Sequence, residues 1–441
     1  MAKLNIFKRL KKAHTHEGAP ARAFGPEAQL RRSVMNCMLW EDQFYEDGEA
    51  IADRIQALVP KVAPETVAAI AIDAREKMKL RHAPLLLVRA MAASEQHRPL
   101  VASTLARVIQ RPDEMTEFLA IYWSDVIGLQ QQRKKRPVPA QVKKGLAKAF
   151  EKFDAYQLAK YDRDGPVRLR DVLFLSHAKP ANADQAKIWK QLVDGTLASP
   201  DTWEVQLSSG AGKKETFERL IAEKKLGALA LLRNLRGMLT AGVTKKTIAN
   251  ALDAMRTDRV LPYRFVAAAR YAPDFEPELE KAMFRSLEGH AKLKGTTRLL
   301  IDVSGSMDAV MSARSEMLRL DAACGLALLA REICEDVEVF AFSDDVKKVP
   351  PRRGFALRDA IVQSQPHRST YLGKAVGEVD QKGVRLIVIT DEQSHDAVPA
   401  PKGEGYMINV APYRNGVGAG DWTRVDGFSE AVIDWIIALE D

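Results

Sequence analysis

The ten-residue stretch 298–307 constrains the fold of this chain more than any other. Its sequence, RLLIDVSGSM, begins as an apolar run and ends in a small, oxygen-rich turn. An apolar run without alternation suits a central strand of a parallel sheet, because helices cover both faces of such a sheet. Asp302, Ser304 and Ser306 are spaced two apart, so an extended backbone would point their oxygens to one side. Gly305 lets the backbone turn tightly, and we expect a helix to begin directly after this turn.

Two later segments complete a set of oxygen ligands. A strand is predicted at 337–343 (VEVFAFS), and Thr370 follows it at the start of a helix-like segment. A second buried strand, RLIVITDE at 385–392, ends in Asp391. Ligands collect at the carboxyl ends of the strands in a doubly wound sheet, where all these side chains would arrive. Carboxylate and hydroxyl oxygens are hard ligands that fit Mg²⁺, with Mn²⁺ as the alternative cation.

The order DxSxS, then Thr, then Asp resembles the von Willebrand factor A domain with its metal-ion-dependent adhesion site. The resemblance implies that Ser304, Ser306 and Thr370 contact the metal most directly, while Asp302 and Asp391 act through water molecules. A polar helix N-cap that binds no metal is the alternative interpretation of the same residues.

Length and composition indicate a soluble globular protein of two or three domains. The chain has 441 residues, of which 46% are hydrophobic and 28% are charged, as in ordinary globular proteins. No apolar run approaches the roughly 20 residues that span a bilayer. Residues 1–20 are predicted to be a basic tail, because they lack the apolar core of a secretory signal. Cys37, Cys324 and Cys334 lie in apolar, helix-like contexts, so we expect reduced core thiols in a cytoplasmic protein.

The net charge of +8 is divided unevenly along the chain. Residues 1–296 contain 50 Lys and Arg against 35 Asp and Glu, whereas residues 297–441 contain 16 against 23. The first part is therefore the candidate for a polyanionic partner, and the second part concentrates acidic side chains as a cation site requires. Charge alone is equally compatible with basic residues that merely solvate helix faces.

The sequence pattern of residues 27–293 predicts consecutive helices and almost no strands. Helical patterns appear at 27–39, 64–78, 84–93 and 99–109, several of them opened by Pro or by an acidic first turn. The short breaks favour helices that pack against their sequence neighbours, in a large bundle or a curved stack of helix pairs. We therefore expect a helical domain over 21–294 and a doubly wound α/β domain over 295–441.

Two segments of the helical part concentrate basic residues. The first, 130–153, carries the run RKKR at 133–136, and the second, 158–180, mixes cations with aromatic residues. The candidate RNA contacts in these segments are Lys143, Lys144, Lys148, Lys160, Arg163, Arg168, Arg170 and His177. For His177 two interpretations stay open: a structural histidine on an apolar helix, or a ring that contacts phosphate or stacks on an unpaired base.

A second resemblance covers nearly the whole chain, from about residue 27 to residue 441. The segments LSHAKP, ALLRNLRGM and LPYRFVAAA precede the adhesion-site domain in the order found in the Ro autoantigen family of TROVE-domain ribonucleoproteins, and GFSEAVIDWI resembles that family's end. The resemblance implies a ring of HEAT-like helical repeats closed by the A-type domain. It also implies that the outer basic surface binds small noncoding Y RNAs and that the central hole admits single-stranded 3′ ends of misfolded RNAs.

Matched position by position, Lys160, Arg163 and His177 fall on RNA-contacting residues of that family, although the loop from Lys160 to Leu169 is one residue shorter here. We therefore expect a monomeric RNA-binding protein, not an enzyme, that acts in RNA quality control or processing. An exoribonuclease or another protein could join through the metal site, and no membrane partner is expected. Two alternatives remain: an adaptor that recruits a partner such as an AAA ATPase through the adhesion site, and a metal-dependent nuclease.

Overall fold

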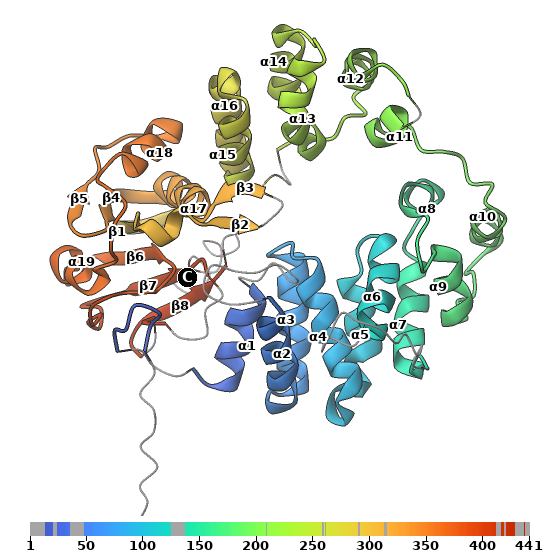
Figure 1. Ribbon diagram of the computed structural model, residues 1–441, viewed down its shortest axis with the longest axis horizontal. Helices are drawn as coiled ribbons and strands as arrows, with labels where there is room; N and C mark the ends of the chain where they lie inside the picture. The colour runs from blue at the N-terminus through green and yellow to red at the C-terminus, as the bar shows by residue number, and fades with distance from the viewer. Residues whose placement is uncertain are drawn as a thin grey trace, which may run out of the picture.

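The computed structural model describes residues 14–20, 24–35, 48–124, 137–208, 210–257, 260, 262–289, 292–312, 315–411, 416–418, 420–427 and 436. Within these ranges, helices follow one another as far as residue 287, and a mostly parallel sheet with its own helices follows them (Figure 1). The predicted fold class, helical repeats followed by an α/β domain, is confirmed. None of the described helices is both long and apolar enough to cross a membrane.

The helical part begins with α1 and ends with α16. Its helices are α1 (Pro26–Met35), α2 (Gly48–Leu58), α3 (Pro64–Glu76), α4 (His82–Ala93), α5 (Arg98–Val108), α6 (Asp113–Trp123), α7 (Ala140–Phe150), α8 (Ala155–Tyr161), α9 (Leu169–Ser176), α10 (Ala183–Asp194), α11 (Trp203–Ser208), α12 (Lys213–Ala222), α13 (Ala228–Thr240), α14 (Lys245–Ala254), α15 (Pro262–Tyr271) and α16 (Glu276–Leu287). Helix α7 shows why such segments fold: Val142, Leu146, Ala149 and Phe150 form one buried stripe at helical spacing.

The second part contains a six-stranded sheet in the order β5-β4-β1-β6-β7-β8. Its strands are β1 (Leu293–Asp302), β4 (Cys334–Phe342), β5 (Val346–Lys348), β6 (Arg385–Thr390), β7 (Gly405–Asn409) and β8 (Thr423–Asp426). All neighbouring strands are parallel except the edge strand β5. Helices α17 (Arg319–Ile333) and α18 (Gly354–Val362) pack in the core of one face, which contains Leu299, and α19 (Leu372–Val379) packs on the other face, against Leu300.

The helix that opens at the DxSxS turn is only the short 3₁₀ helix η4 (Gly305–Asp308), and no α-helix follows it directly. Bonds from Met307 N to Ser304 O (2.9 Å) and from Ala309 N to Ser306 O (3.3 Å) close this 3₁₀ helix. A two-stranded hairpin follows, made of β2 (Val310–Ser312) and β3 (Ser315–Leu318), and α17 begins only after it. The chain alternates here between an exposed Val310 and a buried Met311, which is the period of a strand and not of a helix.

The cysteine prediction needs a similar correction. Cys324 lies in α17, as expected, but Cys334 is the first residue of strand β4. Both thiols are buried, and Cys37 lies outside the described residues. Burial in apolar surroundings raises the pKa of the Cys324 thiol far above its usual range, so this thiol packs as a core residue.

Both ends of the helical part contact the sheet domain. At one end, Arg424 of β8 donates a 3.2 Å hydrogen bond to the Ala28 carbonyl of α1. At the other end, Arg270 of α15 pairs with Asp321 of α17 at 2.5 Å. The helices therefore curve away from one side of the sheet domain and return to another, which closes a ring (Figure 1).

Candidate metal site and RNA-binding surface

Backbone hydrogen bonds hold the loops after β1, β4 and β6 together. Gly305 donates from its backbone N–H to the Arg368 carbonyl at 2.8 Å, and His395 donates to the Thr370 carbonyl at 2.8 Å. The side chain of Ser343, just after β4, donates to the Ser369 carbonyl at 3.1 Å. These bonds bring the predicted metal-site loops to one edge of the sheet, the edge where the strands end.

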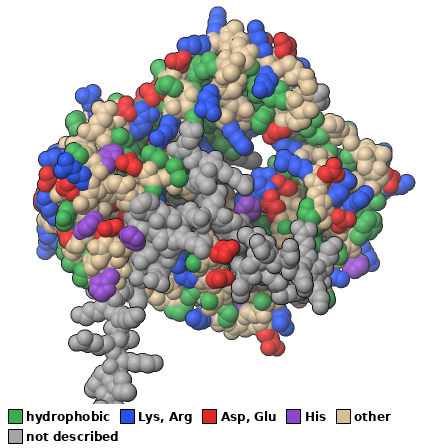
Figure 2. Space-filling model, in the orientation of Figure 1, with side chains coloured by type: hydrophobic (Ala, Val, Ile, Leu, Met, Phe, Trp, Pro, Cys, Tyr) green, Lys and Arg blue, Asp and Glu red, His purple; other side chains and the backbone are tan. Residues whose placement is uncertain are grey.

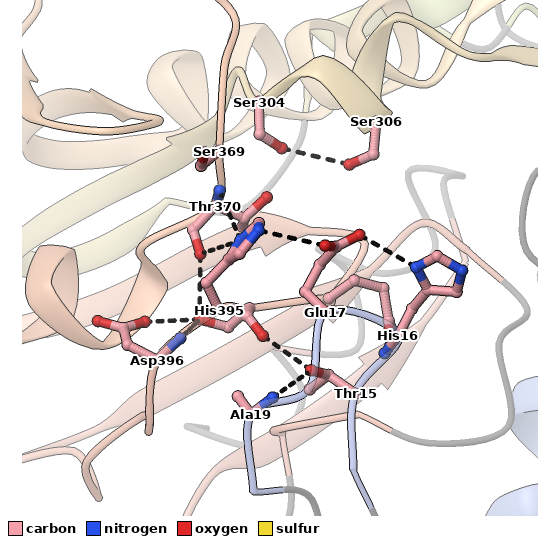
Figure 3. A network of polar contacts seen from close by, with 12 residues as sticks. Thr15, His16, Glu17, Ala19, Ser304, Ser306, Ser369, Thr370, His395 and Asp396 are labelled. Carbon is pink, nitrogen blue, oxygen red and sulfur yellow. Dashed lines mark hydrogen bonds and ion pairs between the residues drawn. The ribbon is translucent and has the colours of Figure 1, made fainter.

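The hydroxyl groups of the predicted site share one small region. The Oγ atoms of Ser304 and Ser306 lie 3.3 Å apart, and Figure 3 shows Thr370 facing them from the neighbouring loop. Ser304 and Thr370 are buried, whereas Ser306 is partly exposed. The region is thus open to solvent on the Ser306 side.

Two carboxylates lie fully buried behind these hydroxyls, Asp302 and Asp391. Asp302 accepts hydrogen bonds from Ser304 N at 2.9 Å and from Thr390 Oγ1 at 2.6 Å. Burial and the nearby charge of Asp391 raise the pKa of Asp302 to about 7, although those hydrogen bonds act in the opposite direction. Charged carboxylates in such surroundings need positive charge nearby.

A cationic side chain supplies part of that charge. The Arg319 guanidinium is buried, and its Nη1 atom lies 3.6 Å from Asp391 Oδ2. One guanidinium against two carboxylates leaves negative charge for a cation to balance, so the donor set fits a hard divalent ion such as Mg²⁺. In the part of the chain that the structure describes, no three His, Cys, Asp or Glu side chains form a metal-binding group, so such an ion would depend on the hydroxyls.

Sequence reasoning missed Arg319 and Thr390. Thr390 lies beside Asp302 because the register of β1 against β6 pairs Ile301 with Ile389, and alternation within one strand does not specify that register. Arg319 comes to the site through the unexpected hairpin that precedes α17.

The residue after Asp391 links the site to the helical ring. Glu392 is fully buried with a φ of 60°. Its Oε1 lies 2.7 Å from Nη1 of Arg32 in α1, and its Oε2 accepts a 2.8 Å hydrogen bond from Gly418 N. Arg32 also lies 3.7 Å from Asp426 of β8. This buried charge cluster joins residues that are 360 positions apart.

The predicted basic residues lie on neighbouring helices of the ring. Lys144 and Lys148 are exposed one turn apart on α7, while Lys143 is partly buried. The run at 133–136 lies outside the described residues. On the face shown in Figure 2, Lys and Arg side chains are spread over the upper and right-hand helices and alternate with acidic ones. Exposed cations of this kind can neutralise phosphate.

Three of the candidate residues lie in the loop between α8 and α9 and in the first turn of α9. Arg163 is exposed, whereas Arg168 pairs with Asp162 and Asp164, each at 3.2 Å. Arg170 lies 4.0 Å from Asp171. The pair of Arg170 with Asp171 is exposed, and exposed ion pairs are weak, so a phosphate group can compete for Arg170. Arg168 is held more firmly, because the Asp162 side chain is 14% exposed.

His177 is exposed at the C-cap of α9 and has a left-handed backbone, with φ 54°. His177 is therefore not a core residue, and its ring is available to solvent. Phe174, which was not among the predicted RNA contacts, is 60% exposed. The buried positions of α9 are Leu169, Val172, Leu173 and Ser176; their helical spacing places Phe174 on the outer side.

A cavity of about 610 Å³ opens where α8 meets α11 and α13. It is lined by three aromatic rings and four cationic side chains among others: Tyr156, Tyr161, Trp203, Lys160, Lys225, Arg233 and Arg256. Tyr156 is 52% exposed, and Lys160 Nζ lies 5.7 Å from the centroid of the Tyr161 ring. Glu204 also lines the cavity, and its buried Oε2 atom has no hydrogen-bond partner among the described residues. Of these residues, only Lys160 was a predicted RNA contact.

Comparison with known proteins gives three findings. The TROVE domain family model matches residues 31–194 and 189–314, which is more than half of the chain. Telomerase protein component 1 from Rattus norvegicus is 22% identical over 303 residues, and the Mus musculus protein is 21% identical over 300 residues. The alignments span 50% and 49% of this chain but 11% of each relative. The crystal structure of the Deinococcus radiodurans RO (RSR) protein matches with a TM-score of 0.59 and 17% identity, covering 92% of this chain and 97% of that one.

Proposed function

This chain belongs to the TROVE-domain family, whose Ro members are RNA-binding ribonucleoproteins, and on that premise we propose that it binds small noncoding RNA of the Y type and single-stranded 3′ ends. Its role would lie in RNA quality control or processing. The cavity between α8 and α13 is the observation that supports this proposal most directly, because it combines cations for phosphate with exposed rings for bases.

The two kinds of contact have different consequences. Lys144, Lys148 and Arg163 are exposed cations that contact phosphate, so they strengthen binding without reading sequence. Tyr156 and His177 are exposed rings on which an unpaired base can stack. Paired bases do not offer their faces in this way, so the rings favour single strands.

An RNA with a free 3′ tail should therefore bind more tightly than the same RNA with its tail paired. Lys160→Ala and Arg163→Ala should weaken both complexes. His177→Ser should penalise the tailed RNA selectively, by about 1–3 kcal/mol, because it removes a stacking platform. Filter binding measures the affinity of each variant for the tailed RNA relative to its affinity for the RNA with a paired tail.

The melting temperature of His177→Ser should stay unchanged, since the ring is exposed. Equal losses for both RNAs would show that His177 contacts phosphate and not a base. Equal affinity of the wild-type protein for the two RNAs would contradict the preference for single-stranded ends.

We also propose that Ser304, Ser306, Thr370, Asp302 and Asp391 hold Mg²⁺ for recognition of a protein partner. A bound divalent cation would supply a hard positive charge that an acidic side chain can ligate. A partner exoribonuclease or ATPase that presents such a side chain could join the ribonucleoprotein there. The observation that favours this second function is the pair of buried carboxylates behind a half-open group of hydroxyls.

Asp302→Asn or Ser304→Ala should abolish binding of Mg²⁺ and Mn²⁺ as measured by calorimetry, because each removes an oxygen ligand or its charge. Asp308→Asn is the matched control, since Asp308 is an exposed carboxylate six residues further on that pairs with His367. Equal affinity in the wild-type and Asp302→Asn proteins would refute the site.

The chemistry that we propose is recognition and not catalysis. A single cation among hydroxyl groups differs from the paired-metal arrangement that many nucleases use. A labelled structured RNA incubated with the protein and Mg²⁺ should therefore remain full length, and cleavage that Asp302→Asn removes would favour the nuclease alternative.

A further inference from the structure

Residues 14–20 form a short loop that lies against the candidate metal site. Thr15 donates from its backbone N–H to the Ala19 carbonyl at 3.0 Å, and Gly18 donates to the Thr15 carbonyl at 3.2 Å. Gly18 has a φ of 92°, a conformation that suits glycine and tightens the loop. Glu17 therefore stands at the tip of a closed turn.

Two side-chain contacts anchor this loop to the residues that follow Asp391. Thr15 is 4% exposed, and its Oγ1 donates to the Ser394 carbonyl at 2.7 Å while it accepts from Ala19 N at 3.0 Å. His16 N donates to Gln393 Oε1 at 2.7 Å. Because Ser394 and Gln393 are fully buried, the loop is attached to a fixed part of the site.

The Glu17 carboxylate is oriented by two imidazole rings. Its Oε2 lies 3.1 Å from His395 Nε2, and its Oε1 lies 3.0 Å from His16 Nδ1. His395 is itself bonded to the predicted metal ligand Thr370, through its backbone N–H to the Thr370 carbonyl (2.8 Å) and through Nδ1 to Thr370 N (3.2 Å). Figure 3 shows His395 between Thr370 and Glu17, with the Glu17 carboxylate on the side of Ser304 and Ser306.

We propose that Glu17 is an internal ligand of the metal site, which occupies the coordination position that an acidic side chain of a partner would otherwise take. The direct ligands Ser304, Ser306 and Thr370 are neutral, and Arg319 already offsets part of the charge of the buried carboxylates. A divalent cation held by neutral hydroxyls gains most from a further carboxylate. Glu17 is 32% exposed, so a competing carboxylate can reach the same position.

This inference rests on the proposed metal site and adds a regulatory consequence. A partner must displace the 14–20 loop before its own carboxylate can bind, so the loop weakens recruitment until it is removed. His16 of this loop lies 377 residues from Gln393 in the sequence, so the contact couples the segment that precedes α1 to the adhesion site.

The test is Mn²⁺ binding to the full chain, followed by electron paramagnetic resonance and by water-proton relaxation. Glu17→Gln keeps the shape of the side chain but removes its charge. It should weaken Mn²⁺ binding by about 10- to 100-fold, the range observed when supporting groups at metal sites are removed, and should add one water molecule to the bound ion. Thr15→Val removes the hydrogen bonds of the Thr15 hydroxyl that anchor the loop, but keeps the Glu17 side chain in the sequence. It should likewise weaken Mn²⁺ binding and increase the number of water molecules on the bound ion.

Glu27→Gln is the matched control, because Glu27 is an exposed glutamate of α1. A synthetic acidic peptide should bind the Mn²⁺-loaded Glu17→Gln protein more tightly than the loaded wild type. If Ser304→Ala abolishes Mn²⁺ binding while Glu17→Gln leaves affinity, water number and peptide binding unchanged, the internal-ligand inference is wrong and the metal site stands. If Ser304→Ala has no effect, the metal site itself is wrong, and with it the inference.

Discussion

The α7 surface and the adhesion-site loops place charge in opposite surroundings. Lys144 and Lys148 are exposed on their helix, whereas Asp302 and Asp391 are fully buried at the end of the sheet. Exposed cations are screened by salt and exchange partners easily, so they suit a long polyanion of variable sequence. Buried carboxylates are fixed by hydrogen bonds and need a compensating charge. The difference indicates that salt should control RNA binding but leave cation binding nearly unchanged.

The largest loss of folding stability should come from a change in the buried charge cluster of Arg32, Glu392 and Asp426, which closes the ring. Arg32→Met leaves Glu392 without its 2.7 Å partner in a site where both side chains are 0% exposed. Removing one member of a buried pair costs about 3–5 kcal/mol, so the melting temperature should fall sharply. Differential scanning calorimetry measures it.

Arg31→Met is the neighbouring control, because Arg31 lies 3.8 Å from Asp73 and is 37% exposed. Its melting temperature should stay close to that of the wild type, as for most surface pairs. Similar losses in the two variants would show that the Arg32 cluster contributes no more than a surface ion pair.

A smaller change in free energy, here in RNA binding, is expected for a variant at the cavity between α8 and α13. Tyr156→Leu removes an exposed ring that can stack on a base, and should weaken binding of a single-stranded RNA by about 5- to 150-fold. Tyr156→Phe keeps the ring and should bind normally. Fluorescence of 2-aminopurine in the RNA measures stacking directly, and equal quenching by the Leu and Phe variants would exclude Tyr156 as a platform.

The smallest change in RNA binding per residue is expected for the lysines of α7. Replacing Lys143, Lys144 and Lys148 by Ala should reduce the slope of log K against log salt by roughly 0.7–0.9 for each phosphate that is no longer neutralised. Mn²⁺ affinity should not change. Because Lys143 is only partly exposed, its contribution should be the least of the three. Lys213→Ala/Lys214→Ala on α12 is the control, and an equal reduction of slope there would mean that the basic surface has no preferred face.

Local sequence patterns predicted most of the strands that carry the candidate metal site and several helices of the ring. The apolar runs of β1, β4 and β6 were recognised, as were the helices α3, α4 and α5. The hairpin of β2 and β3 was missed, because short strands between a turn and a helix bury little and leave a weak pattern. The outward position of Phe174 was readable from helical spacing but was overlooked.

Periodicity along the chain was enough to place Asp302 and Asp391 at the ends of buried strands. The sequence also located the basic residues before residue 180. Strand patterns and charge runs are properties of neighbouring residues, so the sequence alone reveals them. The folded structure was needed to show that Arg32 neutralises Glu392 and that Arg319 lies beside Asp391. It was also needed to show that Glu17 pairs with His395, near the hydroxyls of the candidate metal site. Arg32 and Glu17 meet their partners across more than 350 residues. Such contacts follow from how the ring closes on the sheet, and no local pattern in the chain encodes that closure.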